Sequence, residues 1–187
     1  KLPSVAALAS GSVRLSGVGL AGIEVVARDP VDNGIINVAI TDVLGDYTLG
    51  LPAGFYQVLP EPGSLGVFAP SAIPPEPYDV DVSASGDVSI VDDPLLCAGS
   101  GPDEDCIGLD FLLAEFNEGS GTGRITGQVL ARRDRDGVPA AVPFAEILLI
   151  DPAKEAPRSS GFTDENGNYS LIAPDGVWFL LIDPFSV

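Results

Sequence analysis

An internal repeat constrains the fold of this chain more than any other feature of its sequence. The segment 163–176 matches the segment 41–54 at an offset of 122 positions and without a gap. The identical residues include Asp42 and Asp164, Gly45 and Gly167, Tyr47 and Tyr169, Leu49 and Leu171, Pro52 and Pro174, and Gly54 and Gly176. The same offset relates Glu24, Asp29 and Pro30 to Glu146, Asp151 and Pro152. The chain therefore holds two copies of one structural unit.

Each copy has the pattern of an antiparallel β-meander. Gly45 and Gly167 can adopt a positive φ at a hairpin turn, and the neighbouring Asp and Asn side chains can cap that turn. The alternation after each glycine, Tyr-Thr-Leu and Tyr-Ser-Leu, is typical of a half-buried strand. A Pro-x-Gly turn and another apolar strand follow, at 52–58 and 174–180. The pattern predicts β-sandwiches.

The order of these motifs resembles the carboxypeptidase regulatory-like family. That order is Gly-x-Val, an apolar strand at 22–27, Thr-Asp-x-x-Gly-x-Tyr-x-Leu and Pro-x-Gly-x-Tyr, and the match covers 11–60 and 123–184. The family consists of transthyretin-like β-sandwiches and is similar to the B-type repeats of bacterial surface adhesins. The resemblance implies an all-β fold of two tandem transthyretin-like or Ig-like antiparallel β-sandwiches. Such sandwiches serve as stalks, adhesion modules or enzyme appendages.

Length and composition agree with two small β domains. A chain of 187 residues suits two domains, expected at 1–118 and 123–187, with a flexible linker at 117–123. The 22 Gly and 17 Pro residues favour turns over long helices. In the first domain we expect a Pro-rich loop at 61–77 and a closing strand at 107–116. The longest apolar runs are far shorter than the roughly 20 residues of a membrane-spanning helix.

The second copy stops early, because residue 187 corresponds to residue 65 of the first. It has no counterpart of 78–91 or 107–116, which predicts an open sheet edge and an apolar groove. Three explanations stay open: the chain was cut, the domain closes with fewer strands, or a strand from another molecule fills the groove. The apolar segment 1–10, with Leu2, Val5 and Leu8, is the candidate donor strand.

Cys97 and Cys106 flank a Gly- and Pro-containing acidic loop. The chain begins with neither Met nor a signal peptide, as expected of a mature secreted protein or of a fragment. Two cysteines in such a loop predict a disulfide. A zinc site would need more ligands, and the chain has no His. A redox-active pair is disfavoured because the spacing is not Cys-x-x-Cys.

The formal net charge of −18 argues against a nucleic-acid partner, which requires clustered Lys and Arg. Solubility outside the cell explains this charge, and calcium binding is the sharper alternative. Asp164, Asn166 and Asn168 have the spacing that opens a calcium-binding EF-hand loop, but the Glu that closes such a loop is missing. Position 175 is Asp, in another turn. We expect no cofactor other than calcium.

The sequence disfavours two covalent modifications. Asn168-Tyr-Ser is a glycosylation sequon, but its place at a strand start disfavours glycosylation. Collagen-adhesin-like relatives of the family carry Lys–Asn isopeptide crosslinks. The two lysines, Lys1 and Lys154, do not occupy the expected first-strand position, so we expect no such crosslink.

Nothing in the sequence favours catalysis. There is no His for general base chemistry, the carboxylates lie at turns, and no Gly-rich phosphate loop opens a helix. We therefore expect an extracellular structural protein that forms a stalk, pilus-like fibre or surface layer from copies of itself. One alternative is an adhesin module that binds glycans or proteins, although Trp178, the single Trp, is expected to face the core. The other is an accessory region of a larger secreted enzyme.

Overall fold

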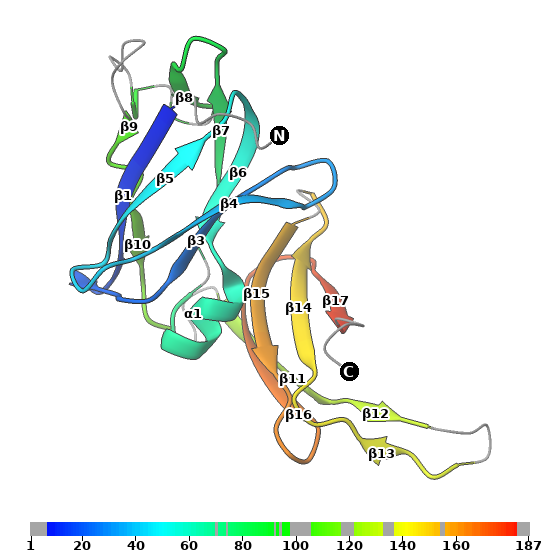
Figure 1. Cartoon of the computed structure of the whole chain (residues 1–187). Coiled ribbons are helices and arrows are strands. Elements are labelled where there is room, and N and C mark those ends of the chain that lie inside the picture. The colour runs from blue at the N-terminus through cyan, green and yellow to red at the C-terminus, as the bar shows by residue number, and fades with distance from the viewer. Residues whose placement is uncertain are drawn as a thin grey trace.

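The computed structural model describes residues 7–69, 71–73, 75–91, 93, 95–97, 106–116, 122–132, 137–153 and 156–182. Within these ranges the protein is an all-β sandwich protein with one short helix. Figure 1 shows two β-rich units. The first unit holds β1 to β10 and α1, and the second holds β11 to β17.

One sheet of the first unit is built around β1, which pairs antiparallel with β5 and β2 and parallel with β9 and β10. Its strands are β1 (Ala7–Leu15), β2 (Val18–Gly19), β5 (Asp46–Leu51), β9 (Cys106–Ile107) and β10 (Phe111–Leu113). The other sheet is antiparallel in the order β4-β3-β6-β7-β8. Its strands are β3 (Glu24–Arg28), β4 (Ile35–Ile40), β6 (Gly54–Pro60), β7 (Tyr78–Val82) and β8 (Val88–Ile90). The apolar side chains between the two sheets form the core.

The second unit repeats part of this arrangement. A three-stranded antiparallel sheet has the order β15-β14-β17, while β11 pairs with β16 and β12 pairs with β13. The strands are β11 (Thr122–Gln128), β12 (Leu130–Ala131), β13 (Ala140–Ala141), β14 (Glu146–Asp151), β15 (Ala156–Phe162), β16 (Asn168–Pro174) and β17 (Phe179–Ile182).

The strand registers of the two units agree residue by residue. Gly11 pairs with Tyr47 in the first unit, and Gly127 pairs with Tyr169 in the second. The β3–β4 pair shifts register after Ala27, and the β14–β15 pair shifts at the corresponding place, after Leu149. The repeated sequences therefore have the same strand pairing, including an irregularity of the β-bulge type at the same place.

The turn of the repeated motif is also the same in both units. Gly45 and Gly167 have φ angles of 84° and 76°, as the sequence predicted. One oxygen of Asp164 accepts backbone N–H bonds from Asn166 and Asn168 at 2.8 and 2.9 Å. The hydroxyl of Thr163 donates to the carbonyl of Val142 and accepts from the amide of Ala145. Asp42 and Thr41 make the equivalent bonds in the first unit.

Two local predictions for the first unit need correction. The segment predicted as a Pro-rich loop contains the helix α1 (Pro62–Phe68), which Pro62 can begin because the first helical N–H needs no partner within the helix. The predicted closing strand is two short strands, β9 and β10. They are separated where Gly108 has a φ of 98° and Asp110 accepts bonds from the backbone and hydroxyl of Ser12.

Helix α1 of the first unit packs against β15 of the second. Beside this contact Arg158, whose side chain is 2% exposed, forms ion pairs with Glu76 at 2.7 Å and Asp151 at 3.6 Å. The guanidinium carbon of Arg158 also lies 5.6 Å from the ring centroid of Trp178. The two units therefore touch through packed side chains as well as through the chain that joins them.

Candidate functional site

The clearest difference between the two units is at β17, the counterpart of β6. In the first unit β6 lies between β3 and β7, so both of its edges are paired. In the second unit β17 pairs with β14 alone among the described strands. The outer edge of β17 therefore presents backbone N–H and C=O groups that can bind another strand.

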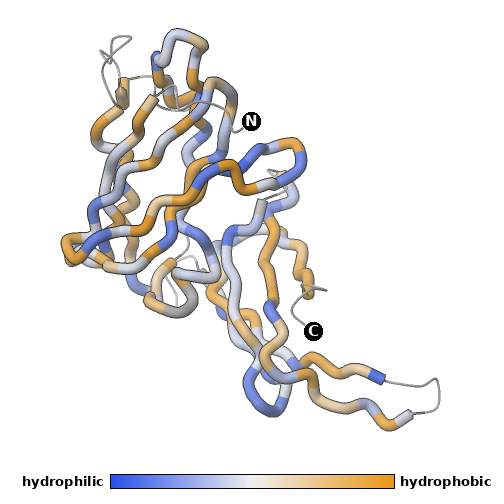
Figure 2. Tube along the Cα trace, in the orientation of Figure 1, coloured by the Kyte–Doolittle hydropathy of each residue, from blue (hydrophilic) through white to orange (hydrophobic). Residues whose placement is uncertain are grey.

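The side chains of these two strands differ in the same way. Val58 is 0% exposed and Leu59 is 2% exposed, whereas their counterparts Leu180 and Leu181 are 44% and 49% exposed. All four residues of β17 are exposed apolar side chains, and Figure 2 shows them as a hydrophobic strand beside the C-terminus. Leu180 pairs with the buried Leu149, so Leu180 shares the core face of its sheet.

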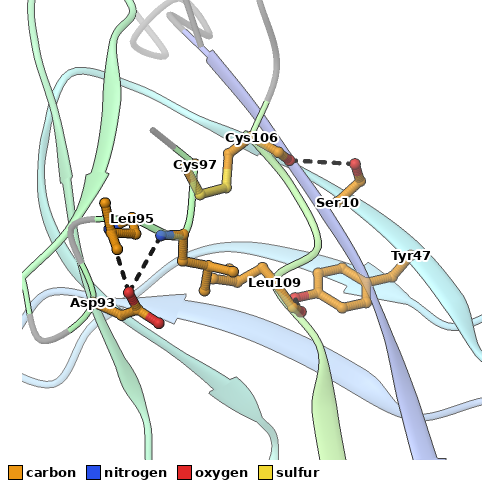
Figure 3. The surroundings of a disulfide bond; sticks show 8 residues. Ser10, Tyr47, Asp93, Leu95, Cys97, Cys106 and Leu109 are labelled. Carbon is orange, nitrogen blue, oxygen red and sulfur yellow. Dashed lines mark hydrogen bonds between the residues drawn. A yellow bond between two sulfur atoms is a disulfide. The ribbon is translucent and has the colours of Figure 1, made fainter. Parts of the chain in front are cut away.

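In the first unit the corresponding side is closed by β7 and β10. These strands belong to different sheets, and they touch through Tyr78 and Phe111, whose ring centroids lie 5.1 Å apart. The buried hydroxyl of Tyr47 donates a 2.7 Å hydrogen bond to the carbonyl of Leu109, just before β10 (Figure 3). Burial raises the pKa of Tyr47 far above its ordinary value, and the negative charges of ionised Tyr78 and Asp110 add to this.

The second unit places its own Tyr in a different environment. The hydroxyl of Tyr169 lies over Gly127, where a Cβ atom would come within 2.5 Å of it. At the equivalent glycine of the first unit, Gly11, the space is filled by the backbone of Leu109. The described part of the second unit has no segment in the place of Leu109, and Tyr169 is only partly buried.

The N-terminal segment that the sequence suggested as a donor strand is partly used within its own unit. Leu8 lies in β1, where Ala7 to Ser12 pair with β5 and where Ala9 and Ser10 also pair with β9. A donor strand that included Leu8 would first have to leave this sheet, so the structure does not support Leu8 as a free donor. Leu2 and Val5 lie outside the described residues.

A disulfide joins Cys97 to Cys106, as the sequence predicted (Figure 3). Cys106 is fully buried in β9, and the hydroxyl of Ser10 on β1 donates to its carbonyl at 3.3 Å. The disulfide thus ties the turn at 95–97 to a strand that helps to close the first unit. A structural disulfide is compatible with an extracellular environment.

The three residues with calcium-loop spacing are engaged in turn chemistry. The side-chain amide of Asn168 donates to both carboxylate oxygens of Asp164, at 3.3 and 3.2 Å. The hydrogen bond from the Asn168 backbone, then that from its side chain, lowers the pKa of Asp164 below its ordinary value. Asn166 contributes its backbone N–H. The turn itself accounts for all three residues, and it directs N–H groups rather than further oxygens at the carboxylate.

Other sequence predictions concern modification, metals and membranes. Asn168 is exposed at the start of β16 and pairs with Gln128, so the sequon lies on a paired strand. Lys1 and Lys154 lie outside the described residues. Within the described ranges, no three His, Cys, Asp or Glu side chains gather as a metal ion would require. Over the same part of the chain, no helix has the length and apolar character that a membrane crossing needs.

The sequence did not reveal which individual residues form the open edge. It also did not reveal a cavity beside Tyr78 and Phe111. The apolar run 177–182 was visible, but its exposure depends on strands that would lie beside it. The cavity joins segments more than 30 residues apart, and no local pattern in one sequence reveals that.

Comparisons with known proteins add no family. No family model matches the chain, and no curated protein matches it. Among solved structures, the TIE protein of Bacillus anthracis is similar with a TM-score of 0.27 and 16% identity, over 94% of this chain and 31% of that one. A DUF3823 family protein from Bacteroides ovatus has a TM-score of 0.31 and 11% identity, over 95% and 91%. A DUF3823 family protein from Parabacteroides merdae has a TM-score of 0.29 and 13% identity, over 90% of this chain and 80% of that one. TM-scores of this size do not establish a shared fold, so nothing about function is carried over from them.

Proposed function

We propose that this chain is an extracellular structural protein whose second unit is completed by a β-strand from another copy, so that copies join head to tail in a fibre or stalk. The observation that carries the proposal is the contrast between β6, which is paired on both edges and buried, and β17, which is unpaired on one edge and apolar. An added strand would give β17 the environment that β7 gives β6.

The free-energy terms for adding a strand at this edge are close to balanced. Each main-chain hydrogen bond to β17 contributes roughly 0.5–1.5 kcal/mol net. Complete burial of a Leu or Ile side chain contributes roughly 1.5–3 kcal/mol, and Leu180 and Ile182 still have 44% and 41% of their surface to bury. Ordering the incoming strand opposes this by about 1–2 kcal/mol per residue. The terms nearly cancel, so a lasting contact also needs other surfaces of the two copies.

Further arguments support an extracellular fibre or stalk. The disulfide suits an oxidising compartment. The units touch through α1 and β15, which favours a semi-rigid spacer over two freely jointed beads. A contact between different surfaces of identical copies does not close on itself and so propagates into a chain. The resemblance to B-type adhesin repeats agrees with a stalk.

Assembly can be tested with variants that blunt the edge of β17. In Phe179→Lys/Leu181→Lys both charges lie on the sheet face away from Leu149, so they oppose strand addition without entering the core. Val31→Lys/Val43→Lys is the matched control, because these apolar side chains are 89% and 85% exposed in the first unit and the added charge is the same. Sedimentation and electron microscopy would measure the concentration needed for fibres.

We expect the edge variant to raise that concentration at least tenfold, which is about 1.4 kcal/mol per added copy, and the control to leave it unchanged or lower it. Amide hydrogen exchange at β17 should slow on assembly of the unaltered chain. Fibres that form equally well with the edge variant would contradict strand addition. A chain that stays monomeric at high concentration and moderate salt would remove the fibre proposal.

A further inference from the structure

The first unit has an apolar edge strand of its own, β4. Among the described strands β4 pairs with β3 alone, so it has an open outer edge, as β17 has in the second unit. All of its residues except Asn37 are apolar. Ile36, Val38 and Ile40 are 42%, 43% and 65% exposed. The chain therefore presents two apolar strand edges to solvent, one on each unit.

Backbone groups on the outer edge of β4 are available to a further strand. Thr41 donates its backbone N–H to Ile23, on the side of β3, so alternation directs the N–H groups of Ile40 and Val38 away from β3. The N–H of Val38 instead donates to the side chain of Asn37 at 2.9 Å. A neighbouring strand can replace this local bond with a bond of the sheet.

The composition of β4 and β17 sets them apart from the rest of the molecule. Among the described strands of four or more residues, only these two contain no Asp, Glu, Lys, Arg, Pro or Gly. Edge strands are normally protected against pairing with other chains by charges, proline or bulges. Two edges without charge or proline, in a chain of net charge −18, are the places where a second copy can add a strand with least repulsion.

The apolar side chains of the two strands lie in rows that can be aligned. Ala39 pairs with the core residue Val25, so Val38 and Ile40 lie on the sheet face away from the core of the first unit. Leu180 lies on the core face of β17, and this is the row that an added strand must help to cover. The outward row of β4 is apolar, as such a cover requires.

An antiparallel register with Val38 opposite Leu180 joins these rows. It also places Ile40 opposite Trp178, so that β4 lies along β17 as β7 lies along β6. Residues 37–40 of β4 pair regularly with β3, and this stretch is as long as β17. The core of the first unit then lies on one face of the joined sheet and the core of the second unit on the other, so the two sandwiches occupy opposite sides.

A strand that is already ordered binds at lower cost than a free segment. β4 is held by its pairing with β3, and the side-chain amide of Asn37 donates to the carbonyl of Gly50 on β5 at 2.7 Å. The loss of conformational entropy that opposes addition of a flexible strand is thus largely absent for β4. This removes the term that brought strand addition at β17 close to balance.

We propose that β4 of one copy is the strand that completes the second unit of the next copy, paired antiparallel with β17. The inference rests on the proposed head-to-tail assembly and names its donor strand. β4 and β17 belong to different units (Figure 1), so the contact is heterologous and propagates. Pairing of β4 with β4, or of β17 with β17, would close as a dimer and leave the other apolar edge exposed.

Mixing two edge variants tests the pairing. In Val38→Lys/Ile40→Lys both charges lie on the face away from the first core, so they block the β4 edge and spare the fold. We expect this variant, like the variant with lysines on β17, to need an at least tenfold higher concentration for fibres. An equimolar mixture of the two retains one intact β4 and one intact β17, so sedimentation should show dimers that do not grow. The Val31→Lys/Val43→Lys control should still form fibres.

Each outcome of the mixing experiment has a separate meaning. Fibres of the β4 variant at the concentration of the unaltered chain would refute β4 as the donor and leave strand addition to β17 standing. Dimers of the β4 variant alone would indicate that β17 pairs with itself, and dimers of the β17 variant alone would indicate that β4 does. Either result would overturn the proposal, as would a mixture that stays monomeric where the unaltered chain assembles.

Disulfide crosslinking tests the register between separate copies. Cys97 and Cys106 are already joined, so a Val38→Cys chain and a Leu180→Cys chain each add one free thiol. Opposite residues in a sheet lie within disulfide distance. Under mild oxidation we expect the 38–180 crosslink, identified by mass spectrometry, to form at least tenfold faster than the crosslink of a Val43→Cys chain with the Leu180→Cys chain. Circular dichroism checks that the variants fold.

Equal rates of crosslinking would overturn the proposed pairing. A selective 38–180 crosslink in a chain that forms no fibres at high concentration would refute the proposed fibre and retain β4–β17 pairing as a contact between two copies. Fibres without the selective crosslink would refute β4 as the donor and retain the fibre.

Discussion

The two units have the same repeated strands and turns, but only the first is a closed sandwich. Glycine turns, Thr and Asp bonds and strand registers coincide between residues 11–60 and their counterparts. One sandwich is nevertheless closed around its core, and the other has an apolar edge strand open to solvent. Val58 is fully buried in β6, while Leu180 at the same place in β17 is 44% exposed.

This comparison shows that the repeated motif determines local pairing but not closure. The bonds of Thr41 and Thr163 link positions about 20 residues apart and are complete in both units. The hydrogen bond from the Tyr47 hydroxyl to the Leu109 carbonyl links positions 62 residues apart. Among the described residues, the second unit has no equivalent of this bond. Closure of the first unit thus depends on β7 to β10, which follow the motif in the sequence.

The largest expected effect is the loss of stability from a cavity at the same core position of each unit. Leu49 is fully buried in the closed core, and Leu171, its counterpart, is 2% exposed in a small core whose neighbours include the half-buried Tyr169 and Trp178. We expect Leu49→Ala to cost about 3–5 kcal/mol of unfolding free energy and Leu171→Ala about 2–3 kcal/mol, because an open core can collapse onto the vacancy. Urea unfolding followed by circular dichroism and by Trp178 fluorescence measures both. Equal costs would show that the second unit is as well packed as the first.

The second largest expected effect is that of reducing the disulfide, which should destabilise the first unit and not the second. The Cys97–Cys106 bond closes a loop with a sequence separation of 9, for which chain entropy predicts about 2–3 kcal/mol in the first unit. Trp178 lies in the second unit and reports on its unfolding. We expect reductant to lower the stability of the first unit and to leave the Trp178 transition where it was. A matching shift of both transitions would mean that α1 and β15 couple the units into one cooperative block.

The sequence predicted those parts of the structure that depend on local chemistry. The repeat predicted the all-β sandwich, the glycine turns at 45 and 167 and the strand alternation, because each depends on residues a few positions apart. The disulfide followed from two cysteines in one short loop. Helix α1 was missed because seven residues rich in Gly and Pro carry no helical periodicity.

The open edge was predicted only in outline, and the cavity not at all. The shortness of the second copy indicated missing strands, but which side chains would be exposed depends on the register of β14 with β17. The cavity depends on Pro75, Asp93 and Phe111 meeting from separate segments. The place of Leu8 in β1 was also not predicted, because an apolar terminal segment has the same pattern as a donor strand and as a strand of its own sheet.

Removal of one hydroxyl from each repeated Tyr should have a smaller and unequal effect. Tyr47→Phe leaves the buried carbonyl of Leu109 without its donor, so we expect a loss of about 1–2 kcal/mol. Tyr169→Phe should be close to neutral, because the hydroxyl of Tyr169 has no such carbonyl among the described residues. Chemical denaturation at pH 7 compares the two variants. A similar loss for both would indicate that Tyr169 bonds to a segment in the place of Leu109.

The raised pKa of Tyr47 adds a pH dependence to the same comparison. A group whose pKa is raised by folding stabilises the fold fully below its unfolded pKa of about 10, and this stabilisation is lost as the pH rises beyond that value. The first unit should therefore lose stability above about pH 10, and Tyr47→Phe should reduce that loss.

The smallest expected effect is at the repeated turn, where Asn168 of the second copy stands in the place of Asp46 of the first. Asn168 donates to both oxygens of Asp164, while the first turn has Asp46 at this place. Because these bonds lower the pKa of Asp164, its carboxylate stabilises the fold above the unfolded pKa of about 3.9. That stabilisation is lost as the pH falls through the lower, folded pKa.

In Asn168→Asp the backbone bonds remain and the side-chain donor is replaced by a like charge. We therefore expect the pKa of Asp164 to rise part of the way to its ordinary value, and a Glu165→Gln control to change it little. Carboxyl NMR titration of Asp164 measures both, and an unchanged pKa in Asn168→Asp would mean that the backbone N–H groups alone set the charge of this turn.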